Sequence, residues 1–133
     1  MPSYDNPQRE TVCFPSKDFS STDVTYVVRG PKGMRGKLRD IIAPVTVTCA
    51  GATTKPKLQV GISGTLTKYA DMDMGVTAAG ACKRASQTSG DIKLVNGLEQ
   101  VLDADTDIYI TLKAATGAGA AGTLVPMFVF EWF

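Results

Sequence analysis

The chain has 133 residues, 44% of them apolar and 20% charged, with a formal net charge of +1, which is typical of one globular domain. It has no histidine, so it lacks the commonest general base, the commonest zinc ligand and every nucleophile–histidine pair; we expect no enzyme, metal or cofactor. No run reaches the roughly 20 apolar residues of a membrane span, and the polar start lacks an export signal, so we expect cytoplasmic synthesis and no membrane partner.

The N-terminal segment is polar, carries three prolines and shows little hydrophobic periodicity. Such a segment is either disordered or an arm laid over another subunit. We therefore expect residues 1–22 to form an extended arm and residues 23–133 to form the domain. The arm, together with the apolar C-terminal strand, predicts self-association as a homodimer or homotrimer.

Seven runs in the rest of the chain are apolar, β-branched or alternating, as strands are. They span residues 23–28, 38–49, 57–63, 66–74, 91–95, 107–114 and 123–133. Glycine-rich patches at 51–56, 75–90 and 115–122 separate them. This pattern predicts an all-β fold, a single antiparallel β-sandwich with the jelly roll as its expected form. Within it, Pro44 indicates a bulge or an edge position, and residues 96–104 allow one or two helical turns.

The C-terminal run MFVFEWF, residues 127–133, is apolar on both of its faces. Phe128, Phe130 and Trp132 fall on one face, and Met127, Val129 and Phe133 fall on the other. A strand of this kind is buried on both faces, by the protein itself or by a partner.

The three cysteines are far apart and have no metal-ligand spacing, so we expect reduced, mostly buried thiols.

The stretch RGPKGMRGKLR, residues 29–39, concentrates the positive charge of the chain. Its cations are Arg29, Lys32, Arg35, Lys37 and Arg39. Residues 1–28 hold two cations and four anions, and residues 40–133 hold seven and nine, so each flank has a balance of −2. These five cations are our candidate partner-binding residues.

Three interpretations of the basic stretch remain open. The spacing of Gly30 and Gly36, with Leu38 after Lys37, does not match a P-loop, and GPKG lies between strands rather than between the helices of a KH domain. A nucleic-acid backbone could still neutralise the cations without sequence recognition. The stretch could also be a solvated hairpin turn. We favour a charged contact with an acidic protein surface.

Two groups of acidic residues resemble cation sites, but the sequence favours other roles for both. Residues 103–107, DADTD, begin like a calcium loop, but Ile108 and Ala114 stand where glycine and glutamate are needed. We expect these carboxylates to lie in the turn before a strand. Asp71 and Asp73 share one side of their strand and are expected to pair with lysines at the surface.

A histidine-free, mostly β chain of this length, with a basic Gly-Pro hairpin and the Gly/Ala-rich loop 115–122, resembles the small capsid cement, or decoration, proteins of tailed bacteriophages. The resemblance spans about residues 23–133 and depends most on YVVRGPKGMRGKL, residues 26–38. It implies a jelly roll or related β-sandwich, assembled as dimers or trimers on the capsid surface of the virion. The implied partner is the major capsid protein, at the joints between its capsomers.

The resemblance assigns no role to any single residue. The alternatives are another virion module, such as a tail, fibre or glycan-binding β-sandwich, and a nucleic-acid-binding module. The four tyrosines are dispersed and Trp132 lies in the terminal strand, which disfavours a glycan site.

Overall fold

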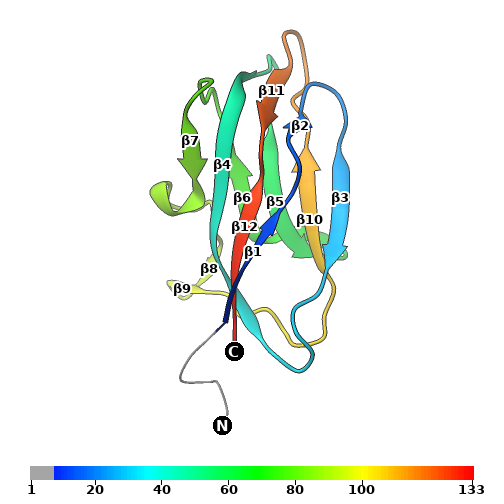
Figure 1. Cartoon of the computed structure of the whole chain (residues 1–133), viewed down its shortest axis with the longest axis vertical. Helices are drawn as coiled ribbons and strands as arrows, with labels where there is room; N and C mark the ends of the chain where they lie inside the picture. Colours follow the sequence, from blue (N-terminus) through cyan, green and yellow to red (C-terminus); the bar gives the residue numbers. More distant parts are fainter. Residues whose placement is uncertain (1–7) are drawn as a thin grey trace.

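The computed structural model of the chain describes residues 8–133 and shows two antiparallel sheets packed face to face (Figure 1). The first sheet has the order β1 (Gln8–Cys13), β12 (Met127–Trp132), β4 (Gly36–Ala50), β11 (Ala121–Leu124) and β2 (Lys17–Asp18), and β7 (Cys82–Arg84) also pairs with β4. The second has the order β3 (Val24–Val28), β10 (Ile108–Lys113), β5 (Lys57–Ile62) and β6 (Thr65–Asp73). A small hairpin joins β8 (Leu94–Val95) to β9 (Leu98–Glu99).

These sheets confirm the predicted all-β antiparallel sandwich, whereas the jelly-roll form stays a prediction. The described residues contain one 3-10 turn, Ala85–Gln87, and no helix there is long and apolar enough to cross a membrane.

Side chains from both sheets form a single core, as the alternation of the sequence predicts. In β10 the buried residues are Ile108, Ile110 and Leu112, and in β12 they are Phe128, Phe130 and Trp132. Burying an aliphatic or phenylalanine side chain contributes roughly 1.5–3 kcal/mol. The other face of β12 is half-buried, with Glu131 between the apolar side chains.

Strand β4 contains a bulge that simple alternation does not predict. Leu38 pairs with Phe130 and Asp40 pairs with Val129, so Arg39 is an extra residue on β4. The bulge lets Leu38 and Ile41 both enter the core although they are three positions apart, an odd spacing that a regular strand would send to opposite faces.

Pro44 lies where the neighbour of β4 changes from β12 to β11. Its carbonyl oxygen accepts a hydrogen bond from the Val125 amide at 3.1 Å. Because Val125 and Pro126 break the terminal run into two strands, the predicted single strand 123–133 is wrong. The predicted irregularity at Pro44 is present, but β4 is an interior strand, with β7 on its other side.

The N-terminal segment belongs to the sandwich from residue 8 onward, which corrects the predicted boundary at residue 22. Strand β1 pairs with β12 along its whole length, from Gln8 opposite Trp132 to Cys13 opposite Met127, and β2 pairs with β11. Removing residues 1–20 would therefore delete strands of the domain. The part of the predicted arm formed by residues 1–7 lies outside the described residues.

Two phenylalanines explain why this segment joins the domain. Phe19 is fully buried, and Phe14 stacks on Tyr26 with ring centroids 4.5 Å apart. Phe14 also meets Phe128 edge to face at 5.8 Å. Charged and polar residues of an edge strand hide its periodicity, so no strand signal is visible here in the sequence pattern.

Four further local predictions differ from the structure. The turn patch 75–90 contains β7, and residues 96–104 form β9 and a loop instead of helical turns. The run 91–95 contributes only the two residues of β8. Among the cysteines, Cys49 is buried, whereas Cys13 and Cys82 are exposed.

Asp91 is a buried acid beside the edge of β6. It is 7% exposed, and its Oδ2 has no hydrogen-bond partner among the described residues. Burial raises the pKa of the Asp91 carboxyl, an effect that Lys83 opposes and that Asp71 and Asp73 add to. The ionised carboxylate therefore destabilises the folded state.

An Asp91→Asn variant is expected to be more stable than the wild type at pH 7. The folded-state pKa lies above the unfolded value of about 3.9, so wild-type stability declines as pH rises from that value through the folded-state pKa. Below about pH 3.9 the carboxyl is protonated in both states, and the advantage of the variant should disappear. Urea denaturation at pH 7 and pH 3 measures this difference, and a variant equally destabilised at both pH values contradicts it.

Candidate docking surface

Two of the three glycines of the basic stretch pack against Trp132, and the third forms the turn. A Cβ atom at Gly30 or at Gly36 would overlap the indole ring. Gly33 adopts a φ of +76° at the tip of the turn, where the Met34 amide donates to the Pro31 carbonyl oxygen at 3.1 Å. The glycines thus shape a tight connection from β3 to β4.

Two aspartates of the acidic run 103–107 accept hydrogen bonds from this turn. Arg29 Nε donates to Asp107 Oδ1 at 2.5 Å, and the Gly33 amide donates to Asp105 Oδ1 at 3.0 Å. The bond to Asp107 raises the pKa of Arg29. Two of the carboxylates that begin like a calcium loop therefore bind the basic turn, and no group of three metal-ligating side chains occurs within residues 8–133.

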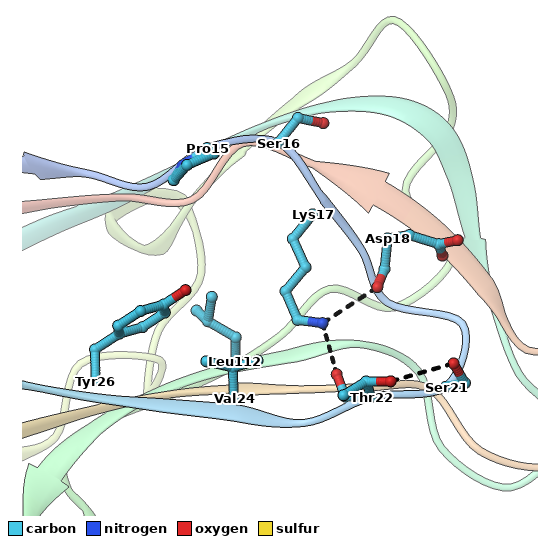
Figure 2. Close-up of a pocket in the computed structure, with 9 residues that line it drawn as sticks. All are labelled: Pro15, Ser16, Lys17, Asp18, Ser21, Thr22, Val24, Tyr26 and Leu112. Carbon is cyan, nitrogen blue, oxygen red and sulfur yellow. Dashed lines mark hydrogen bonds between the residues drawn. The ribbon is translucent and has the colours of Figure 1, made fainter.

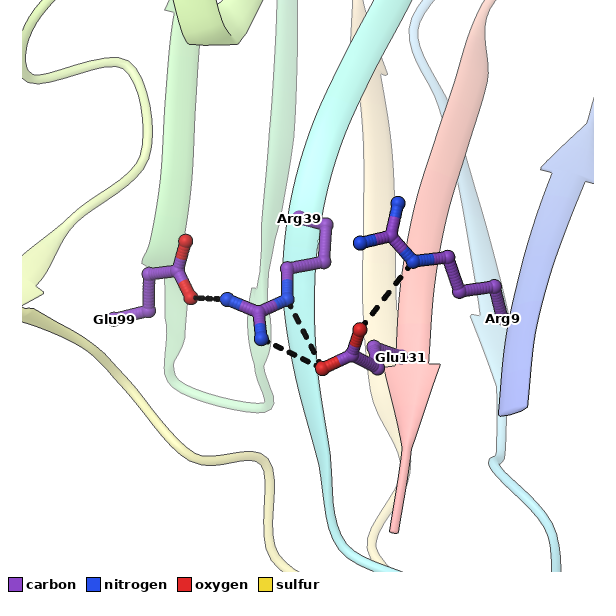
Figure 3. Close-up of polar contacts among 4 residues, drawn as sticks. All are labelled: Arg9, Arg39, Glu99 and Glu131. Atoms are coloured by element: carbon purple, nitrogen blue, oxygen red, sulfur yellow. Dashed lines mark hydrogen bonds and ion pairs between the residues drawn. The ribbon is translucent and has the colours of Figure 1, made fainter. Parts of the chain in front are cut away.

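Arg39 is held in an ion-pair cluster on the outer face of the first sheet (Figure 3). Its Nε and Nη2 donate to Glu131 Oε1 at 3.2 and 2.6 Å, and its Nη1 bonds Glu99. Arg9 Nε lies 3.3 Å from the other Glu131 oxygen. The hydrogen bonds from Arg39 lower the pKa of Glu131. Arg39 follows the buried Leu38 on β4, so strand alternation points it outward into this cluster.

The five candidate cations thus divide into two groups. Arg29 and Arg39 have acidic partners within the chain. Among residues 8–133, no ion pair is found for Lys32, Arg35 or Lys37. Arg35 lies over the Phe133 ring at 5.4 Å, a cation–π contact that leaves its charge uncompensated.

An exposed apolar hairpin lies at the same end of the sandwich as the basic turn (Figure 1). Leu94 is 54% exposed, Val95 is 53% exposed and Leu98 is 71% exposed. Asn96 and Gly97, with φ values of 53° and 78°, form the two-residue turn between β8 and β9. The Asn-Gly turn is predictable from the sequence, whereas the second strand after it was not predicted.

Two contacts fix this hairpin beside the basic turn. Glu99 bonds Arg39, and residues 36 and 102 exchange two backbone hydrogen bonds of 3.0 and 2.7 Å. These contacts tie the hairpin to the start of β4, at the same end of the sandwich as the basic turn. We use the name docking surface for Lys32, Arg35 and Lys37 of the turn taken together with Leu94, Val95 and Leu98 of the hairpin.

A separate open groove of about 440 Å³ lies between the N-terminal segment and β3 (Figure 2). Lys17 Nζ reaches into it and donates to the Thr22 carbonyl oxygen at 2.6 Å and to that of Asp18 at 3.2 Å. Tyr26, Val24 and Leu112 line its opposite wall. The ammonium of Lys17 is held by these two carbonyl oxygens, whereas the docking surface has three cations, so we place the candidate contact with a charged partner there.

Comparison of the chain with models of protein families, with curated proteins and with solved structures gives no match.

Proposed function

We propose that the protein is a structural component of a phage virion, a capsid cement protein that binds the outside of the capsid. Its partners in this proposal are the major capsid protein, across joints between capsomers, and further copies of itself as a homodimer or homotrimer. The observation that carries the proposal is the docking surface, which places three cations without an ion pair among residues 8–133 and three exposed apolar side chains at the same end of the sandwich.

The two kinds of side chain would have different roles at such an interface. Buried apolar residues supply most of the affinity of a protein complex, whereas complementary charges steer the approach and fix the orientation. Isolated apolar residues are common on protein surfaces, but grouped apolar residues with a polar rim are typical of interaction sites. Many copies on one shell would gain from multivalency if they also touch each other.

Reversing the charge of Lys32 and Lys37 to glutamate is expected to weaken docking on capsids about tenfold at low salt, which corresponds to about 1.4 kcal/mol. Exposed ion pairs contribute about 0–1 kcal/mol each, and the reversal adds repulsion to that loss. The difference should shrink as salt rises, because screening weakens the attraction in the wild type. Capsid occupancy measured by cosedimentation at several salt concentrations tests this expectation, with thermal stability unchanged.

The matched control is the reversal of Lys55 and Lys57, which follow the opposite end of β4. Both double variants change the formal net charge from +1 to −3, so a general charge effect would reduce docking equally in both. A nucleic-acid clamp predicts a different result: wild-type protein would bind bare duplex DNA with a salt slope near one per phosphate neutralised. Unchanged capsid occupancy together with lost DNA binding would rule out the cement function for this surface.

A further inference from the structure

Strand β3 is an edge of the second sheet, and its outer side is unpaired within the described part of the chain (Figure 1). The strand reads VTYVV, with no charge, proline or bulge. Val27 is 52% exposed and Tyr26 is 39% exposed. An apolar, regular edge of this kind presents free backbone donors and acceptors to another strand.

The other sheet edges of the described chain are protected in ways that β3 is not. Strand β1 carries Arg9 and Glu10, β2 has only two residues, both charged, and β7 has only three residues, two of them cationic. The edge of β6 is covered: the Asp71 amide donates to the Asp91 carbonyl oxygen, and the Lys93 amide donates to that of Tyr69, both at 2.8 Å. Charges, short length and coverage are the usual protection of edges against pairing.

The residues that flank β3 make it complementary to itself. Asp23 precedes the strand and Arg29 follows it. Asp23 lies 3.7 Å from Lys113 and Arg29 bonds Asp107, but both side chains remain more than half exposed and can also face a charge on a second copy. If two copies pair antiparallel about Tyr26, Asp23 of each copy lies opposite Arg29 of the other. The same register places Val24 opposite Val28 and Thr25 opposite Val27. Opposite charges at both ends favour this register over slipped ones, because cross-strand partners of unlike charge attract.

We propose that β3 is the self-association surface of the protein, where two copies pair antiparallel about Tyr26 and join their second sheets into one. The pairing is isologous, as the symmetry of a homodimer requires. A five-residue strand pair is small by the standards of stable interfaces, so the dimer is weak in solution and depends on concentration. The inference goes beyond capsid docking and can fail independently of it, because its test uses the purified protein alone.

Sedimentation equilibrium over a wide range of concentrations tests the proposal with one variant and one control. Val27→Lys is expected to weaken self-association at least tenfold, since lysine on an exposed edge opposes strand pairing. Val76→Lys makes the same substitution at a valine that is 69% exposed and lies in a turn, and it should associate like the wild type. Equal association of Val27→Lys and wild type would overturn the proposal.

A mixing experiment tests the register itself. Asp23→Lys alone and Arg29→Glu alone each place like charges opposite one another in a homodimer, so each should be monomeric where the wild type dimerises. In an equimolar mixture, the heterodimer places the introduced lysine of one variant opposite the introduced glutamate of the other. Its second pair is the native one, Asp23 opposite Arg29, so association should return. Far-UV circular dichroism verifies that both variants are folded, because Asp23 also accepts a bond from the Ala114 amide.

Hydrogen exchange shows whether the strand that pairs with β3 comes from a second copy or from another protein. Outward amides of β3 should become protected as the protein concentration rises. If the wild type stays monomeric and β3 is protected only on capsids, the edge binds a strand of another protein and the proposal is wrong.

Discussion

Replacing Trp132 with alanine is expected to lower the free energy of unfolding by about 3–5 kcal/mol, the usual cost of removing a large buried aromatic side chain. The indole is 3% exposed and stacks on Phe130 with ring centroids 5.3 Å apart and an angle of 12° between the planes. Its Nε1 donates to Glu10 Oε1 at 3.2 Å, which links the last strand to the first. The substitution therefore removes core packing and a cross-strand bond together.

Phe133→Ala provides the matched control, because Phe133 is the neighbouring aromatic residue and is only half-buried. It should lose distinctly less stability than Trp132→Ala. Urea denaturation followed by circular dichroism compares the two, since Trp132 is the only tryptophan and its fluorescence is lost in the first variant. Equal losses would mean that the packing of the Trp132 ring against Gly30 and Gly36 adds nothing to the free energy of unfolding.

Gly36→Ala is expected to destabilise the fold by about 1–3 kcal/mol, the typical cost of overpacking a core. The new Cβ would overlap the Trp132 ring and would also approach the Glu131 carbonyl oxygen to 3.2 Å. The indole cannot withdraw, because Phe130 lies against one face of it. Tryptophan fluorescence during urea denaturation measures the loss directly.

A double-mutant cycle identifies the cause of that loss. In a Trp132→Leu background the same Gly36→Ala change should cost less, with a coupling energy of about 0.5–3 kcal/mol. Strictly additive costs would show that Gly36 is constrained by something other than the indole. Both results bear on function, because Gly36 starts β4 next to Lys37 and thereby sets the position of the docking surface.

The fold class was predictable from local patterns alone. Residues 107–114 alternate regularly, and the structure makes a strand of 108–113 with the expected face buried. The bulge at Arg39 was not predictable, because it follows from how β4 and β12 fit together. The N-terminal strands were missed for a related reason: an edge strand with one solvent-exposed side needs few apolar residues.

The candidate site was predictable as a set of residues but not as a surface. Charge alone identified the basic stretch, yet the acidic partners of Arg29 and Arg39 lie 60 to 92 positions away in the sequence. Only the fold shows that these two arginines have acidic partners, whereas no ion pair is found for Lys32, Arg35 or Lys37 among residues 8–133. The apolar hairpin is not among the predicted strands, because residues 96–104 also allow helical turns, although Asn-Gly flanked by apolar residues is a strong hairpin signal.

The pairing of β1 with β12 has a consequence for the synthesis of the protein. Among residues 8–133, β1 has no neighbour in its sheet except β12. At about 5–20 residues per second, a ribosome takes on the order of ten seconds to translate from one to the other. During that interval the nascent chain holds β1 without its partner and leaves one side of β4 open. Products that stop before Met127 can never close the first sheet, and their exposed strands make them substrates for chaperones, proteases or aggregation.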